Sequence, residues 1–231
     1  MGSTRLPGKV LADLDGHSMV ERVVRRCEQI QSLDNVVVAI PDSPSDDILA
    51  DFLESRAFAV FRGPEHDVLA RYHLAAEALG ADVVVRVTAD CPLLDPEVSQ
   101  AVIAAFLRRG ADYASNTVIR TYPRGLDTEV FSVAALRRAS RDATEPADRE
   151  HVTRYIWSNP GIYRLVHVRA RHNRSSLRWT VDTPEDLAFV RAVLIELRAM
   201  GDNFRYRDVL ALLRRKPNLT RINAHVVQKP V

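Results

Sequence analysis

Short apolar runs alternate with helical patterns along the first 110 residues of this 231-residue chain. Residues 35–40, 58–61 and 82–87 are runs of the kind that form buried strands, and helical patterns separate them. Strands that alternate with helices form a parallel sheet with helices on both faces. The sequence therefore predicts a three-layer α/β fold. Ligand-binding loops are expected after residues 40, 61, 87 and 181, at the carboxyl ends of strands.

Three helix starts are marked by capping residues. Ser18 forms a capping box with Glu21, Asp95 precedes Pro96, and Thr183 opens the segment Thr-Pro-Glu-Asp. The pattern changes after residue 110, with short apolar pieces at 112–133, a helical pattern at 146–158 and two strand candidates within 162–181. We find no repeat and no low-complexity linker, so the sequence predicts a single domain.

Composition excludes several classes of protein. Apolar residues make up 46% and charged residues 27%, and the formal net charge is +2, so composition gives no reason to expect nucleic-acid or membrane binding. No run approaches the roughly 18 apolar residues of a membrane span, and the start does not resemble a secretion signal. Two cysteines, Cys27 and Cys91, are too few for a disulfide framework or a zinc site. We expect a cytoplasmic protein.

Residues 2–11 form a Gly/Pro loop that carries two cations, Arg5 and Lys9. Such a loop turns tightly and directs backbone N–H groups and positive charge at an anion. It is not a Walker A loop, because that motif has four residues between its glycines and Ser or Thr after the Lys. Here five residues separate Gly2 from Gly8, and Val10 follows Lys9. A phosphate-binding loop of another kind is predicted.

Two aspartates stand at the ends of strand-like runs. Asp90 follows the apolar run that begins at residue 83, and Asp182 lies between the run 177–181 and a capped helix. Mg²⁺ in proteins is held by one or two carboxylates, with phosphate and water completing its shell. The residues alone leave other interpretations open, because Asp90 can cap the following turn and Asp182 can be a helix-flanking acid.

Three further segments carry candidate binding residues. Residues 62–72 follow a strand, although Asp67 can also be a helix N-cap with Arg71 as its i+4 partner. Residues 115–117 and 122–130 bring Asn116, Arg124, Asp127 and Glu129 close in sequence, and a polar hairpin end remains an alternative, above all for Glu129. In residues 149–153, a structural role at a seam is favoured for His151 over a general base.

Taken in order, five blocks of the chain resemble the sugar cytidylyltransferases, in particular their SpsF-like branch of spore-coat polysaccharide biosynthesis, which is related to CMP-Kdo and CMP-sialic acid synthetases. The blocks are the loop 2–11 and residues 62–72, 88–93, 115–130 and 177–187. The resemblance implies a Rossmann-like nucleotide-diphospho-sugar transferase (GT-A type) fold with a mostly parallel sheet. It implies a nucleotide-binding half at 1–110, an acceptor and dimerisation half at 111–200, and a C-terminal helix and tail at 201–231.

The same resemblance implies transfer of CMP from CTP to an acidic sugar, with release of pyrophosphate and with Mg²⁺ on Asp90 and Asp182. Catalytic roles are implied for Arg5, Lys9, Asp90 and Asp182, and acceptor binding for Asn116, Arg124, Asp127 and Glu129. Nucleotide binding is implied for Gly2, Ser3, Thr4, Arg5, Lys9, Arg62, Asp67 and Arg71. Two alternatives are a glycosyltransferase on the same fold and a non-catalytic nucleotide- or sugar-binding relative.

Members of this branch carry a first apolar strand and the residues Ala-Arg before the Met-Gly-Ser-Thr-Arg loop. We therefore expect the central first strand to be missing from the chain as it stands, and the native protein to start earlier. The alternative is that residues 222–227 fill the place of that strand. A homodimer is expected, with an interface in residues 112–170 that draws on apolar positions such as Tyr155, Ile156, Trp157 and Ile162.

Overall fold

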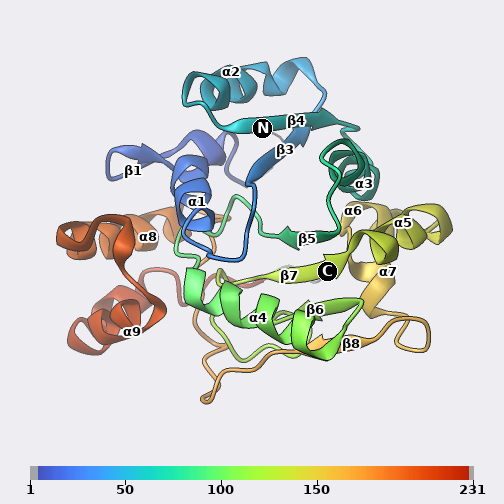
Figure 1. Ribbon diagram of the computed structural model, residues 1–231. Coiled ribbons are helices and arrows are strands. Elements are labelled where there is room, and N and C mark those ends of the chain that lie inside the picture. The colour runs from blue at the N-terminus through green and yellow to red at the C-terminus, as the bar shows by residue number, and fades with distance from the viewer. Residues whose placement is uncertain (1–4, 229–231) are drawn as a thin grey trace.

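Two separate β-sheets and a short hairpin carry the strands of this computed structural model, which describes residues 5–228 (Figure 1). Strand β3 (Val37–Pro41) pairs in parallel with β4 (Ala59–Gly63). The larger sheet has the order β5 (Val83–Arg86), β7 (Glu129–Ser132), β6 (Tyr113–Ser115) and β8 (Leu165–His167). The hairpin is β1 (Asp13–Leu14) with β2 (His17–Ser18).

The predicted mostly parallel sheet is wrong for the larger sheet, which is mixed. Strand β7 runs antiparallel to both of its neighbours, β5 and β6, and only β6 and β8 are parallel. The physical reason is the connection: residues 116–128 join β6 to β7 without a helix. Parallel neighbours need a crossover connection, usually helical, whereas a direct return gives an antiparallel pair. The α/β class of the prediction is confirmed.

Helices cover both faces of the larger sheet, as expected for three layers (Figure 1). The helices of the described residues are α1 (Met19–Cys27), α2 (Asp47–Ser55), α3 (Val68–Ala78), α4 (Pro96–Arg109), α5 (Val133–Asp142), α6 (Pro146–Glu150), α7 (Arg154–Trp157), α8 (Pro184–Leu197) and α9 (Tyr206–Arg215), with 3-10 helices η1 (Lys9–Leu11), η2 (Pro44–Asp46), η3 (Arg198–Asn203) and η4 (Pro217–Arg221). Of these, α2 packs on β4 of the smaller sheet. The N-caps predicted at Ser18, Asp95 and Thr183 are confirmed, but the predicted capping box of Ser18 with Glu21 is only half formed, because the Glu21 side chain binds Arg25 and His17. The Ser18 and Asp95 side chains accept from the backbone three residues on, and Thr183 forms a reciprocal capping box with Asp186.

Successive residues of the central strands point to opposite faces and pack in different cores. Ala114 and Val130 pack with α1 and α4, whereas Tyr113 and Phe131 pack with α3, α5 and α7. A third core surrounds Trp179, α8 and α9. The sheet is thus buried on both sides, and its strand ends carry the loops that form the candidate site.

Within residues 5–228, β3 pairs only with β4, and β5 pairs only with β7. The facing edges of β3 and β5 are therefore not joined by a backbone ladder (Figure 1). The alternative in which residues 222–227 form the missing strand is wrong, because they form no strand and Ile222 packs against the core around Trp179. The expectation of an earlier native start stays a prediction.

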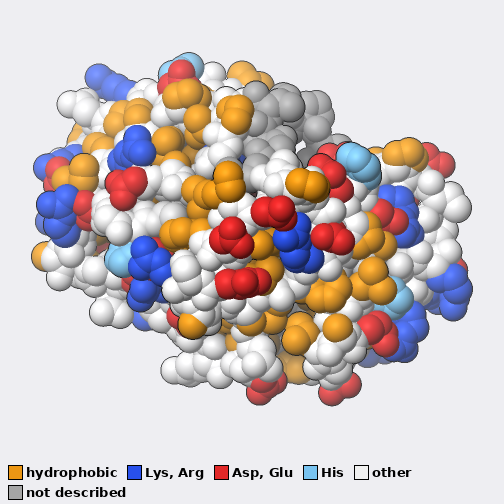
Figure 2. Space-filling model, turned by 90° about the horizontal axis from the view of Figure 1, so that it is seen from above, with side chains coloured by type: hydrophobic (Ala, Val, Ile, Leu, Met, Phe, Trp, Pro, Cys, Tyr) orange, Lys and Arg blue, Asp and Glu red, His pale blue; other side chains and the backbone are white. Residues whose placement is uncertain are grey.

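Charges of both signs lie side by side on the described part of the face in Figure 2. This mixture agrees with the formal net charge of +2. Among the helices of the described residues, none is both long and apolar enough to cross a membrane.

Candidate active site

One ammonium group joins the two predicted metal ligands. Lys9 is the first residue of η1, and its Nζ donates to Asp182 Oδ1 at 2.9 Å and to the carbonyl oxygen of Val181 at 2.6 Å. The same Nζ lies 3.3 Å from Asp90 Oδ2. Residues from the N-terminal loop, the segment after β5 and the start of α8 therefore meet at one point. Of the four loops expected at strand ends, those after residues 87 and 181 join this cluster.

Backbone hydrogen bonds fix the separation of the two aspartates. The amide of Val181 donates to the carbonyl oxygen of Asp90 at 2.8 Å, and Thr180 Oγ1 donates to the same oxygen at 3.1 Å. On the other side, Thr88 Oγ1 donates to Asp90 Oδ1 at 2.5 Å. The Asp90 carboxylate is therefore aimed by a neighbouring hydroxyl while its second oxygen faces Lys9.

Asp182 is surrounded by cations. Arg178 Nη2 lies 2.8 Å and Arg5 Nη2 3.2 Å from Asp182 Oδ2, while Lys9 takes the other oxygen. Burial raises the pKa of this carboxyl, but the hydrogen bonds of Lys9 and Arg178 and the charge of Arg5 outweigh it and hold the pKa below its ordinary value. Asp182 is therefore an ionised carboxylate at neutral pH, ready to bind a cation.

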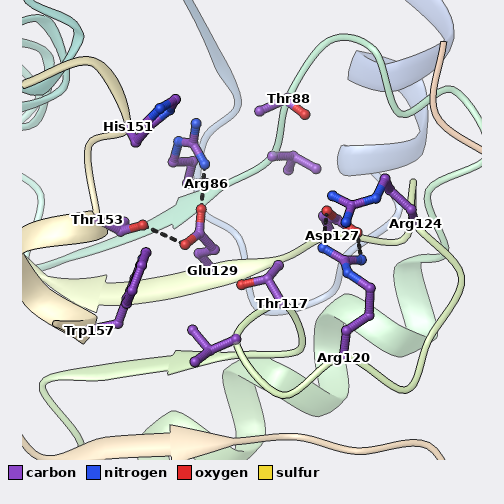
Figure 3. A pocket seen from close by; sticks show the side chains of 12 residues that line it. Arg86, Thr88, Thr117, Arg120, Arg124, Asp127, Glu129, His151, Thr153 and Trp157 are labelled. Carbon is purple, nitrogen blue, oxygen red and sulfur yellow. Dashed lines mark hydrogen bonds and ion pairs between the residues drawn. The ribbon is translucent and has the colours of Figure 1, made fainter. Parts of the chain in front are cut away.

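A cavity of about 380 Å³ opens beside this cluster (Figure 3). Thr88, which donates to Asp90, is one of its lining residues, so the cavity and the cluster are adjacent. The cavity is lined by Arg86, Val87, Thr88, Thr117, Val118, Arg120, Arg124, Asp127, Glu129, His151, Thr153 and Trp157. Figure 3 shows Arg120, Arg124 and Asp127 on one side, and Arg86, Glu129, His151, Thr153 and Trp157 on the other.

Both carboxylates of the cavity are already paired. Arg120 binds Asp127 through two hydrogen bonds of 2.6 and 2.7 Å. Glu129 pairs with Arg86 and accepts from Tyr113 Oη at 2.6 Å and from Thr153 Oγ1 at 2.5 Å. Burial raises the pKa of Tyr113 well above its ordinary value, so this phenol stays a donor. These carboxylates shape the cavity wall and have little capacity left for sugar hydroxyls.

Arg124 is the cavity's uncompensated cation. Among residues 5–228 its guanidinium has no hydrogen-bond or ion-pair partner. Burial, followed by the charge of Arg120, lowers its pKa, and the attraction of Asp127 is smaller. A half-buried guanidinium without a counterion favours an incoming anion, because the anion replaces lost hydration with a charge-assisted bond. The cavity is therefore suited to a ligand with a carboxylate or phosphate.

Several sequence-predicted residues lie elsewhere and hold loops in place. Both ends of the Asn116 side-chain amide are used on backbone groups, Leu126 O at 2.6 Å and Thr128 N at 2.9 Å. Arg62 binds Asp47 at 2.7 Å and the carbonyl oxygen of Ser43 at 3.0 Å. The residues Gly2, Ser3 and Thr4 lie outside the described residues.

Asp67 is the N-cap of α3, as the alternative interpretation held, and accepts from Ala70 N at 2.8 Å. Its ion-pair partner is Arg149 of α6, however, and not Arg71. Arg71 instead donates to the carbonyl oxygen of Pro64 at 2.7 Å and braces the preceding loop. These contacts fix the segment after β4.

Sequence reasoning missed Arg178, Arg120, Thr88 and Trp157 as site residues, and it favoured a structural role for His151, which lines the cavity. The sequence does contain a signal for Arg178 as a site residue, because this cation stands four residues before Asp182 and eight before Asp186.

The Val152 backbone has φ +57°, an uncommon conformation for a β-branched residue, between cavity residues His151 and Thr153. No local pattern in the sequence predicts this backbone conformation at Val152.

The geometry agrees with what comparison with known proteins shows. A family model described as cytidylyltransferase matches residues 1–208. The spore coat polysaccharide biosynthesis protein SpsF of Bacillus subtilis is 36% identical over 225 residues, which cover 94% of this chain and 92% of SpsF. A 3-deoxy-manno-octulosonate cytidylyltransferase of Anaeromyxobacter dehalogenans is 30% identical over 84% of this chain and 93% of its own.

Among solved structures, a cytidylyltransferase from Leptospira borgpetersenii superposes with a TM-score of 0.91 at 27% identity, over 100% of this chain and 95% of that one. The similarity extends over the Lys9, Asp90 and Asp182 segments and over the whole cavity, because the family model spans all of them. The chain belongs to the cytidylyltransferase family.

Proposed function

We propose that this protein transfers CMP from CTP to a hydroxyl of an acidic sugar, with release of pyrophosphate, in the synthesis of a surface polysaccharide. The observation that carries the acidic acceptor is Arg124, a cation without a partner among the described residues, in a cavity adjacent to the Asp90 and Asp182 carboxylates. The names of the SpsF and octulosonate relatives support the same class of substrate.

The reaction would be a single in-line displacement. A bond forms between the acceptor oxygen and the α-phosphorus, and the bond from that phosphorus to the bridging oxygen breaks, so that pyrophosphate leaves with the electron pair and the hydroxyl proton passes to solvent water. The protein's part is orientation and charge neutralisation. We propose that Lys9 and Arg5 neutralise the outer phosphates, while Arg124 orients the acceptor in the cavity.

Mg²⁺ fits the residues at this site. The Asp90 and Asp182 oxygens converge on one cation, the Lys9 ammonium, and would hold the metal ion together with phosphate oxygens. When bound, Mg²⁺ neutralises phosphate charge and orients the reacting groups.

Pyrophosphate release tests the function directly. The protein is mixed with CTP, Mg²⁺ and each member of a panel of acidic sugars, with neutral analogues as controls. Pyrophosphate and a CMP-sugar in equal amounts support the proposal. Transfer of sugar from a nucleotide sugar to a second acceptor would identify a glycosyltransferase. Binding of CTP without turnover over the full panel would contradict the proposed reaction.

Replacing Lys9 or Arg5 with alanine should weaken CTP binding more than CMP binding. The reason is that CMP lacks the two outer phosphates that these cations would contact. Loss of one charge-assisted contact corresponds to roughly a tenfold or larger rise in the CTP dissociation constant. Calorimetric titration with both nucleotides measures the difference. An equal loss for CTP and CMP would place the two side chains away from the outer phosphates.

Arg124→Gln should raise the KM for the acidic acceptor by about 10- to 100-fold, because it removes the charge opposite the acceptor's anion. The KM for CTP should stay nearly unchanged. Arg171→Gln is the matched control, since Arg171 is an exposed arginine outside the cavity and its removal should change neither constant. Steady-state kinetics with each substrate varied in turn gives both values. A rise confined to the KM for CTP would contradict the assignment.

We also propose a cytoplasmic homodimer whose interface uses the region 112–170. Ile162 supports this, because 41% of its surface is exposed, whereas Ile156 is fully buried and Trp157 lines the cavity. The surface available for an interface in this region is therefore smaller than the sequence suggests. Light scattering at tens of micromolar, as a rough working range, tests the assembly, and a monomer would contradict it.

A further inference from the structure

The Arg178 guanidinium binds two carboxylates, those of Asp182 and Asp186. Its side chain is 9% exposed, and its Nη2 donates to Asp182 Oδ2 at 2.8 Å. The Nε and Nη2 groups also donate to the two oxygens of Asp186, each at 2.9 Å. One guanidinium fork therefore connects the reacting centre to a second, deeply buried carboxylate.

The Asp186 carboxylate is buried and held in one orientation by its hydrogen bonds. It has no exposed surface and is the acidic member of the capping box that starts α8. Its Oδ2 also accepts from the amides of Asp182 at 3.0 Å and of Thr183 at 3.1 Å. A carboxylate held by so many donors cannot rotate without breaking several of them, so the arginine that binds it in a fork is equally fixed.

The C-terminal segment Asn223–Gln228 completes this arrangement. Asn223 is 3% exposed, and its Nδ2 donates to Asp186 Oδ1 at 2.8 Å and to the carbonyl oxygen of Arg178 at 3.0 Å. Gln228 Oε1 accepts from Arg178 Nη1. Residues more than 40 positions away in sequence thus contact both the backbone and the guanidinium of Arg178.

The backbone of Arg178 also pairs with that of Arg124, which lies on the side of the site proposed to bind the acceptor. Arg124 and Arg178 form an isolated parallel bridge, in which Arg124 N donates to Leu177 O at 3.0 Å and Trp179 N donates to Arg124 O at 2.7 Å. The residue that binds Asp182 through its side chain is therefore paired through its backbone with Arg124, the cavity cation whose guanidinium has no partner among residues 5–228.

We propose that Arg178 is a positioning residue for the reaction, and that the C-terminal segment Asn223–Gln228 holds it in place. Arg178 occupies Oδ2 of Asp182 and leaves Oδ1 directed at the point that Lys9 now fills. Without Arg178, the Asp182 carboxylate keeps its contacts with Lys9 and Arg5 but loses the partner that Asp186 holds in a fixed orientation. This inference rests on the proposed function, since it assigns Asp182 to the reacting centre.

The test compares Arg178→Lys and Gln228→Ala with the unaltered full-length chain. Lysine keeps the charge but cannot form the fork, so kcat should fall by about 10- to 100-fold while the KM for CTP changes by less than about threefold. Gln228→Ala removes the side-chain contact to Arg178 Nη1 at the edge of the arrangement, and kcat should fall by about three- to tenfold, with an unchanged melting temperature. Arg191→Lys, the same exchange in α8 at an exposed arginine that binds the carbonyl oxygen of Asp13, should leave kcat unchanged.

Hydrogen exchange gives a readout that does not depend on turnover. The Asp182 and Thr183 amides both donate to Asp186, and in Arg178→Lys they should exchange at least about tenfold faster while amides of the central strand β7 do not change. Unchanged exchange at Asp182 and Thr183, or unchanged kcat in both variants, would overturn the proposal. If the unaltered protein shows no CTP turnover, the proposed function fails, and exchange alone decides whether Arg178 positions Asp182.

Discussion

Asp182→Asn and Asp90→Asn should each lower kcat by at least about a hundredfold and leave the fold intact. Asparagine has nearly the same shape as aspartate and still accepts hydrogen bonds, but it lacks the negative charge on which Lys9, Arg5 and Arg178 converge. It is also a poor ligand for Mg²⁺ compared with a carboxylate. Steady-state turnover with CTP, Mg²⁺ and the acceptor identified from the panel measures the effect.

A control for the loss of charge itself is Glu185→Gln. Glu185 is an exposed acid three residues after Asp182 in the first turn of α8, and its replacement should leave kcat unchanged. Circular dichroism and the melting temperature of each variant report on folding. Mg²⁺-dependent turnover that survives in either Asp variant, at the level of the Glu185→Gln control, would disprove the assignment of the two aspartates to the metal ion.

Gly125→Ala should destabilise the protein by about 3 kcal/mol or more. Gly125 has φ +106°, and a Cβ atom there would lie 2.6 Å from the carbonyl carbon of Trp179 and 2.7 Å from the nitrogen of Thr180. These are backbone atoms next to Val181 and Asp182, so they cannot move aside without disturbing the site. The backbone conformation also disfavours any residue with a Cβ atom.

Urea unfolding measures the loss, which for a chain of this size corresponds to a fall in melting temperature of roughly 6–12 °C for 3 kcal/mol. Gly161→Ala is the matched control, because a Cβ atom at Gly161 would meet nothing within 4 Å and the change should stay within about 0.5 kcal/mol. Equal stability of the two variants would show that the turn at residue 125 can relax away from Trp179.

The approach of Asp90 to Asp182 could be predicted from the sequence, because it follows from a general property of the fold, whereas their shared contact with Lys9 could not. Each aspartate ends an apolar run, and the ends of parallel strands and the loops before helices collect at one edge. The caps at Ser18, Asp95 and Thr183 could be predicted for a similar reason, since they depend only on residues within one turn of the helix.

The internal partners of the cavity residues could not be predicted. Glu129 was expected to bind sugar hydroxyls, but its carboxylate is used by Arg86, Tyr113 and Thr153. These contacts depend on how β7 pairs with β5 and β6, and no pattern in the sequence indicates that β7 runs antiparallel to both. Whether a polar side chain is free or already satisfied is decided by residues tens of positions away.

Within residues 5–228 no backbone ladder joins the sheet of β3 and β4 to the larger sheet. Their connection depends on side chains, such as those of α3, which packs on β4 and on α5, and on the ion pair between Asp67 and Arg149. Local unfolding follows such divisions, because a region with fewer buried contacts opens at a lower free energy. The core around β3, β4 and α2 also includes Val10 and Leu11, which follow Lys9, and Ala89, which precedes Asp90. A fluctuation that opens this core is therefore expected to loosen the contact between Lys9 and Asp90.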